Sequence, residues 1–154
     1  MSYSIHYQKE AVLQALRMHF IKQSEIKSLM ILVNIYAIVT GVLLFMKKIR
    51  PEPFLLGSVL WIVLMLFFWF GLPNLFYKKT ALFKQDWEFK FNSTEAILMG
   101  DLGEASWAWE TVTHYFESPD FFHFYFGPKS FFLIPKSNLT QEDQHIIRGI
   151  LKGK

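Results

Sequence analysis

The chain has no cysteine and few charged residues among its 154 positions. Without cysteine it has no disulfide, no thiolate metal site and no cysteine nucleophile. Charged residues make up 19% of the chain, against about 25% in an ordinary soluble domain. Hydrophobic residues reach 52% and aromatic residues 18%. This composition excludes a disordered, collagen-like or coiled-coil chain, and it exceeds what a soluble domain of this length easily buries.

Sequence motifs for catalysis are also missing. The chain contains no G-x-S-x-G, no glycine-rich phosphate loop and no S-x-x-K with its usual partners. The carboxylates Asp101 and Glu104 flank a predicted hairpin tip, where solvation explains them better than paired acid and base roles. We therefore expect no enzyme activity, no cofactor and no metal.

Two long uncharged runs dominate the N-terminal half, at about residues 29–46 and 54–72. At a rise of about 1.5 Å per residue, each run is long enough to cross a hydrocarbon layer of about 30 Å as a helix. Buried core helices usually show a polar stripe, which these runs lack. Together with the short basic linker between them, they predict a transmembrane helical hairpin over residues 29–73.

Lysine and arginine placement predicts the orientation of this hairpin. Six basic residues lie close outside the two runs, and three lie in the linker: Lys47, Lys48 and Arg50. The positive-inside rule then places both termini in the cytoplasm, in a multi-pass protein of the bacterial inner (cell) membrane.

Charge is divided unevenly along the chain. Residues 1–79 carry nine Lys and Arg against three Asp and Glu, a net of +6, whereas residues 80–154 carry seven against ten, a net of −3. The basic excess therefore belongs to the predicted membrane segment. Without a basic patch on the remaining part, we expect no nucleic-acid partner.

The segments outside the hairpin predict α+β structure. Residues 1–28 fit a short strand followed by an amphipathic helix. Residues 80–154 read as short alternating strands, followed by a helix that begins at Thr140 as N-cap. We expect a curled antiparallel sheet that this C-terminal helix closes, on the pleckstrin-homology-like (PH-like) plan.

Several short motifs strengthen this interpretation. The runs Trp109–Val112, Glu117-Ser118, Phe122–Tyr125 and Phe132–Lys136, with His19-Phe20 before the two apolar runs, resemble the YcxB-like family of bacterial membrane proteins. The resemblance implies two N-terminal membrane helices and a cytoplasmic PH-like domain over residues 80–154. It implies no catalytic residues.

The resulting hypothesis is a membrane-anchored PH-like binding or scaffold protein. Its partners would be the lipid bilayer and a protein of unidentified kind. A membrane-resident immunity or antitoxin protein that neutralises a toxin is the first alternative, and an enzyme of unknown type ranks last.

Three groups of residues are candidates for interaction. Asn34, Ala37 and Gly41 share one helical face, which serves either a homodimer through the first membrane helix or packing within the hairpin. Trp107 and Trp109 share a strand face. The third group is His114 and His123, which lie diagonally on one sheet face if Phe116 pairs with His123. A structural role is the better interpretation of both histidines, because a metal site needs a third ligand in addition to this pair.

The predicted orientation leads to a direct test. A reporter that is active only in the cytoplasm, fused after Lys154, should be active, and a reporter that needs the periplasm should be silent there. A third fusion within the Lys47–Arg50 linker should show the reverse pattern. A periplasm-active fusion at the C-terminus would contradict the placement of both termini.

Overall fold

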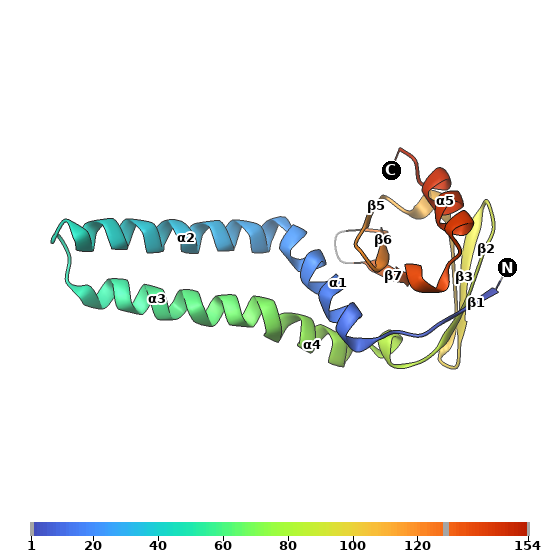
Figure 1. Cartoon of the computed structure of the whole chain (residues 1–154), viewed down its shortest axis with the longest axis horizontal. Coiled ribbons are helices and arrows are strands. Elements are labelled where there is room, and N and C mark those ends of the chain that lie inside the picture. Colours follow the sequence, from blue (N-terminus) through green and yellow to red (C-terminus); the bar gives the residue numbers. More distant parts are fainter. Residues whose placement is uncertain (1, 128–129, 154) are drawn as a thin grey trace. The chain divides into compact units, whose positions relative to one another are not determined.

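The computed structural model describes residues 2–127 and 130–153 (Figure 1). The chain divides into two compact units. One is an α+β unit, which comprises the chain up to Ala15 and again from Thr80 onward, and the other is a helical unit over Leu16–Lys79. One boundary between them falls inside helix α1 (Lys9–Lys22), so a single helix contributes residues to both units.

The helical unit is built around an antiparallel helix pair. Helix α2 (Ser24–Phe45) is followed by α3 (Pro51–Leu66), the π-helical turn η1 (Phe67–Gly71) and α4 (Leu72–Lys79). The segment from Pro51 to Lys79 is long and apolar enough to cross a membrane, and so is α2. Helix α2 begins before the predicted first span (29–46), and the segment Pro51–Lys79 continues beyond the predicted second span (54–72).

A tight turn joins α2 to α3. Lys47 adopts a left-handed backbone conformation with φ of 56°. The Lys47 N–H donates to the Leu44 carbonyl and the Lys48 N–H to the Leu43 carbonyl, both at 2.9 Å. This is the Schellman arrangement that ends a helix. Pro51 then begins α3, where a missing N–H has no cost.

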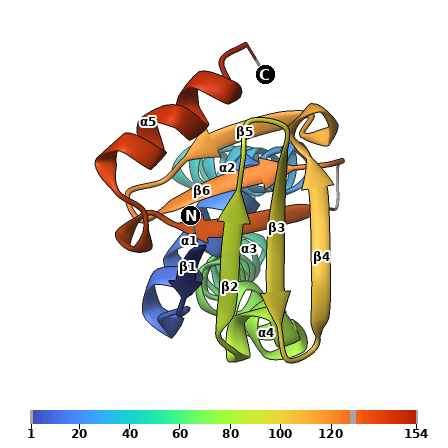
Figure 2. The same ribbon diagram turned by 90° about the vertical axis from the view of Figure 1, so that its right-hand side faces the viewer.

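The α+β unit contains two separate antiparallel sheets (Figure 2). The first has the order β1-β2-β3-β4 and the second the order β5-β6-β7. The N-terminal strand joins the first sheet at its edge, with Tyr3 opposite Phe89. The strands are β1 (Ser2–Ile5), β2 (Trp87–Phe91), β3 (Glu95–Gly100), β4 (Gly103–Ala108), β5 (His114–Glu117), β6 (Phe121–Tyr125) and β7 (Phe131–Pro135).

The prediction of one curled sheet is therefore wrong. After β4, the 3-10 turn Trp109–Thr111 takes the chain out of the first sheet, and β5 starts a second one. Among the described strands, β4 pairs only with β3 and β5 only with β6. The alternating pattern predicted the individual strands, but strand periodicity carries no information about which strands share a sheet.

Aromatic rings link the two sheets. Trp107 on β4 lies 5.2 Å from Phe132 on β7, measured between ring centroids, and Trp109 lies 5.6 Å from Phe124 on β6. Phe89 and Phe124 are fully buried, as expected for a core between two apolar sheet faces.

Helix α5 (Gln141–Ile150) connects both sheets. The Thr140 hydroxyl accepts a hydrogen bond from the Asp143 N–H at 3.2 Å, which confirms the predicted N-cap. The Tyr3 hydroxyl of β1 donates to the Asp143 carboxylate, and Arg148 binds Glu117 of β5. Ile147 is fully buried, so α5 is part of the core of this unit.

Two adjacent isoleucines of α5 test its role. Ile147 is 0% exposed and Ile146 is 45% exposed. Ile147→Ala should lower the free energy of unfolding by about 2–5 kcal/mol, because it leaves a cavity. Ile146→Ala is the matched control and should cost less than about 1 kcal/mol. Thermal or denaturant unfolding of the full-length protein in mild detergent measures both, and equal losses would contradict a core role for α5.

Candidate membrane anchor and interaction surfaces

Helices α2 and α3 expose apolar side chains on most of their surface. Ile38 is 66% exposed and Leu56 is 71% exposed, and many other large apolar residues of both helices are about half exposed. Leaving apolar surface in water costs about 25 cal/mol per Å². A surface of this kind is typical of helices surrounded by lipid. Both α2 and the segment Pro51–Lys79, which α3 begins, are long enough to span a bilayer.

The few polar side chains between α2 and α3 have partners inside the pair. The Trp61 indole N–H donates to the Asn34 amide oxygen at 3.1 Å, and the Asn34 amide nitrogen donates to the Met30 carbonyl at 2.6 Å. Thr40 and Ser58 donate to carbonyls of their own helices. Polar groups in an apolar phase must be satisfied internally, and these groups meet that requirement.

Small residues allow close packing across the pair. A Cβ atom at Gly57 would lie 2.3 Å from Cε1 of Tyr36, so any larger residue would displace that ring. A Cβ atom at Gly41 would lie 3.4 Å from the Phe54 ring. Gly41 thus faces α3 within the same chain, and Asn34 already has its partner there. This geometry favours packing within the hairpin over the homodimer, which stays a prediction.

Sequence reasoning missed Trp61 and Gly57. A hairpin centred on the linker residue Arg50 would place Asn34 beside residues 65–68, which offer no polar side chain. The turn ends α2 at Phe45 and starts α3 at Pro51, which shifts the centre by about two residues and brings Trp61 opposite Asn34. The available signal was the indole itself, since a tryptophan in a membrane span needs an acceptor for its N–H.

A break in the second long helix has its own partner. Pro73 has no N–H, so the carbonyl of Trp69, four residues earlier, loses its helical hydrogen bond. The adjoining turn is π-helical, with the Leu72 N–H bonded to the Phe67 carbonyl. Arg17 Nε donates to the Trp69 carbonyl oxygen at 2.8 Å. Arg17 therefore donates the hydrogen bond that the Trp69 carbonyl oxygen cannot receive from Pro73.

The Arg17 guanidinium also lies over two aromatic rings. Its Cζ atom is 5.7 Å from the Trp69 ring centroid and 5.3 Å from that of Phe70. Cation–π attraction at such distances contributes about 0.5–1 kcal/mol at exposed sites and more where water is excluded. Arg17 thus fixes the end of α1 to the α3–α4 junction.

Trp107 of β4 and Trp109 of the 3-10 turn that follows β4 pack in the core of the α+β unit. Trp109 is 3% exposed, and its indole N–H donates to the Asn92 carbonyl at 2.8 Å. Trp107 is half-buried against Phe126 and Phe132. Both residues were candidates for an interaction surface, and the structure brings them into the packing between the sheets.

The histidine pair adopts the register in which Phe116 faces His123 and His114 faces Tyr125. His123 is fully buried, with its ring 3.9 Å from that of Phe116, whereas His114 is exposed. Within residues 2–127 and 130–153, no three His, Asp or Glu side chains are grouped as metal ligands would be. The geometry fits packing roles for His123 and Phe116.

A charged cluster joins β5 to the C-terminal part of the chain. Arg148 donates from Nε and a terminal nitrogen to the two Glu117 carboxylate oxygens, at 2.7 and 3.0 Å. The Lys136 ammonium lies 2.8 Å from the same carboxylate. Hydrogen bonding from Arg148 holds the pKa of Glu117 below its usual range. A bidentate pair with this geometry fixes positions, so the cluster is a structural link.

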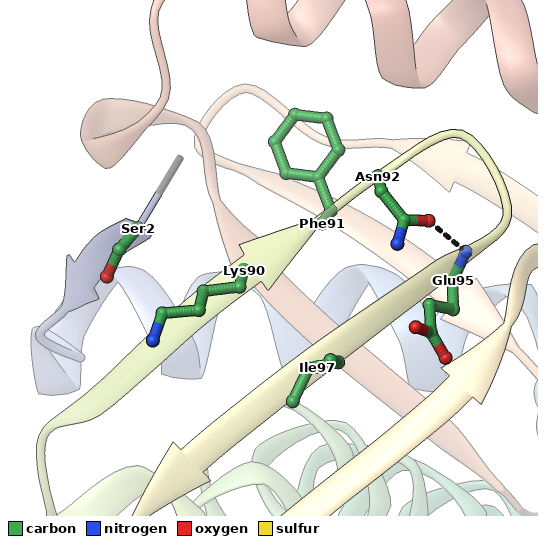
Figure 3. Close-up of a pocket in the computed structure, with 6 residues that line it drawn as sticks. All are labelled: Ser2, Lys90, Phe91, Asn92, Glu95 and Ile97. Atoms are coloured by element: carbon green, nitrogen blue, oxygen red, sulfur yellow. Dashed lines mark hydrogen bonds between the residues drawn. The ribbon is translucent and has the colours of Figure 1, made fainter.

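A shallow hollow of about 260 Å³ lies on the first sheet (Figure 3). Its rim includes Ser2, Lys90 and Glu95, and the Glu95 N–H donates to the Asn92 amide oxygen at 2.8 Å. Lys90 forms an ion pair with Glu88 at 3.3 Å. One cation and one carboxylate on an open surface define no ligand chemistry.

These features define a class: an α+β domain joined to a hairpin of two apolar, membrane-length helices. A family model described as YcxB-like protein matches residues 94–151, from the start of β3 to the end of α5. The resemblance to YcxB-like proteins is thereby confirmed over this segment. No curated protein and no solved structure matches the chain.

The Arg17 contact is testable with a double-mutant cycle. Arg17→Met should destabilise the helical unit by about 1–3 kcal/mol, because the Trp69 carbonyl loses its donor. In a Pro73→Ala background the new N–H restores a helical donor, so the same substitution should cost clearly less. Detergent unfolding followed by circular dichroism measures both losses.

Lys48→Met is the control for this cycle, because it removes a cation from the hairpin turn and leaves the Trp69 carbonyl untouched. Equal costs of Arg17→Met in the two backgrounds would show that Arg17 does not act through this carbonyl.

Proposed function

We propose that the chain is a membrane-anchored binding or scaffold protein of the bacterial inner membrane, with both termini in the cytoplasm. The observation that carries this proposal is the exposed apolar surface of α2 and α3, combined with a separate α+β unit that has a filled core. The resemblance to YcxB-like proteins supports the bacterial membrane setting.

The α+β unit would be a PH-like domain. Two antiparallel sheets face each other through aromatic rings, and α5 contacts both of them through Asp143 and Arg148. A C-terminal helix packed against antiparallel sheets supports the PH-like domain that the family resemblance implies. The domain would present its outer surface to a protein partner.

In this proposal the protein acts by binding a partner and does not catalyse a reaction. The Glu117 carboxylate is bound by Arg148 and Lys136, and the Asp143 carboxylate by Tyr3 and Thr140. Each of these groups links two elements of the fold, which supports a structural role for the main polar clusters.

Membrane retention tests the anchor. The full-length protein should stay in the membrane fraction after an alkaline carbonate wash and be released by detergent. Leu60→Arg with Val63→Arg should reduce retention, because each arginine at a helix centre opposes insertion of the second segment by about 2.5–3.5 kcal/mol. Leu102→Arg, at an exposed hairpin tip, is the control that should be retained. Wild-type protein in the soluble fraction would refute the proposal.

Partner identification tests the binding role. Crosslinking in cells, followed by purification of the full-length protein in mild detergent, should recover a defined membrane or cytoplasmic protein. Recovery of a toxin would support the immunity alternative instead. Absence of any specific crosslinked protein over a Leu60→Arg/Val63→Arg control would contradict a scaffold role.

A further inference from the structure

The end of the helical unit opposite the hairpin turn contains a hollow of about 500 Å³. It is lined by Ile21 and Lys22 at the end of α1, and by residues of the first three turns of α2. Its volume lies within the range of small-molecule sites. All of its lining residues belong to the helical unit.

The lining residues of α2 form one stripe. Lys27, Met30, Ile31 and Asn34 follow each other at the i, i+3, i+4 and i+7 spacing that places side chains on one helix face. Cation, apolar pair and amide therefore succeed one another along about 10 Å of helix. Glu25, two residues before Lys27, does not line the hollow and lies on another face of the helix.

The order of the cations and the apolar side chains matches the order of phosphate and acyl chain in a phospholipid, and the Asn34 amide beyond them is bonded to Met30 and Trp61. Lys22 and Lys27 are exposed at the polar end of the hollow. Ile21, Met30 and Ile31 provide an apolar wall where α2 becomes a continuous apolar run. A phosphate between the two ammonium groups would leave an acyl chain lying along this wall.

The α2 N-terminus adds to the positive potential. Gln23 at the N-cap makes no side-chain hydrogen bond to the first turn of α2, and its amide nitrogen lies 3.2 Å from His19 Nε2. The partial positive charge of a helix N-terminus favours a nearby anion. It adds to the positive charge of Lys22 and Lys27.

We propose that this hollow binds one anionic phospholipid molecule, with the headgroup phosphate at Lys22 and Lys27 and an acyl chain along Met30 and Ile31. The site would hold the end of α1 and the start of α2 at the membrane surface. The proposal rests on the membrane anchor proposed above. It concerns the helical unit, whereas the net negative charge of residues 80–154 gives the α+β unit no comparable attraction for anionic lipid.

Native mass spectrometry of the full-length protein in an uncharged detergent tests the proposal. Phosphatidylglycerol and phosphatidylcholine with identical acyl chains are the two probes. The wild-type protein should bind one phosphatidylglycerol in preference to phosphatidylcholine, with a preference that falls as salt rises. Lys22→Gln with Lys27→Gln should weaken phosphatidylglycerol binding about thirtyfold, from the usual contribution of two basic residues near an anionic surface.

Two further variants separate site binding from general charge. Lys47→Gln with Lys48→Gln removes the same charge at the hairpin turn and should leave binding unchanged. Ile31→Trp keeps both lysines but fills the apolar wall, and it should reduce binding as well. Soluble glycerol phosphate should fail to displace the lipid, because it lacks the acyl chain.

The proposal is overturned if both lipids bind equally, if the Lys47/Lys48 variant loses as much binding as the Lys22/Lys27 variant, or if glycerol phosphate competes fully. A wild-type protein that stays in the membrane after carbonate washing, yet shows no lipid preference, refutes only this lipid site. A protein absent from the membrane refutes the anchor itself.

Discussion

The surfaces of α2 and α3 are apolar and therefore unfavourable in water. The hydrogen bonding of the helical unit depends on this constraint. Both helices expose branched and aromatic side chains on most of their circumference. In an apolar surrounding the backbone must satisfy its own hydrogen bonds, which an uninterrupted helix does. Polar side chains there must also find partners, and Asn34, Thr40, Ser58 and Trp61 find theirs within the helix pair.

The same constraint explains the one irregular place in the second long helix. Pro73 and the π-helical turn at Phe67–Gly71 disturb the regular ladder of hydrogen bonds. Arg17 reaches the Trp69 carbonyl from another helix, and Asn74 donates to the neighbouring Phe70 carbonyl at 2.6 Å. The disturbed turn is thus stabilised by side chains, and its position near the end of the apolar run lets a cation approach from the polar side.

The α+β unit depends on a different force, the burial of aromatic rings between two sheets. Phe89, Phe122 and Phe124 are fully buried, and Trp107 and Trp109 bridge from the first sheet toward the second. Aromatic residues therefore serve different purposes in the two units. Those of the strands fill a core, whereas Trp69 and Phe70 lie beside Arg17 at the end of the apolar helix.

The sequence by itself determined the features that depend on neighbouring residues. Two uncharged runs predicted two membrane-length helices, alternation predicted the strands, and Thr140 predicted the start of α5. The β5–β6 register stayed conditional on the turn between the strands, and the structure has Phe116 opposite His123. Periodicity and capping are local, so they can be recognised in a single sequence.

Only the tertiary structure decided which distant residues meet. It paired β1 with β2, separated the strands into two sheets, and brought Trp61 to Asn34 and Arg17 to the Trp69 carbonyl. Each of these contacts depends on how a turn sets the register between two elements. A hairpin turn centred two residues further along the chain would give Asn34 an apolar neighbour in place of Trp61. Such registers follow from the packing of whole elements, which no local pattern of residue types specifies.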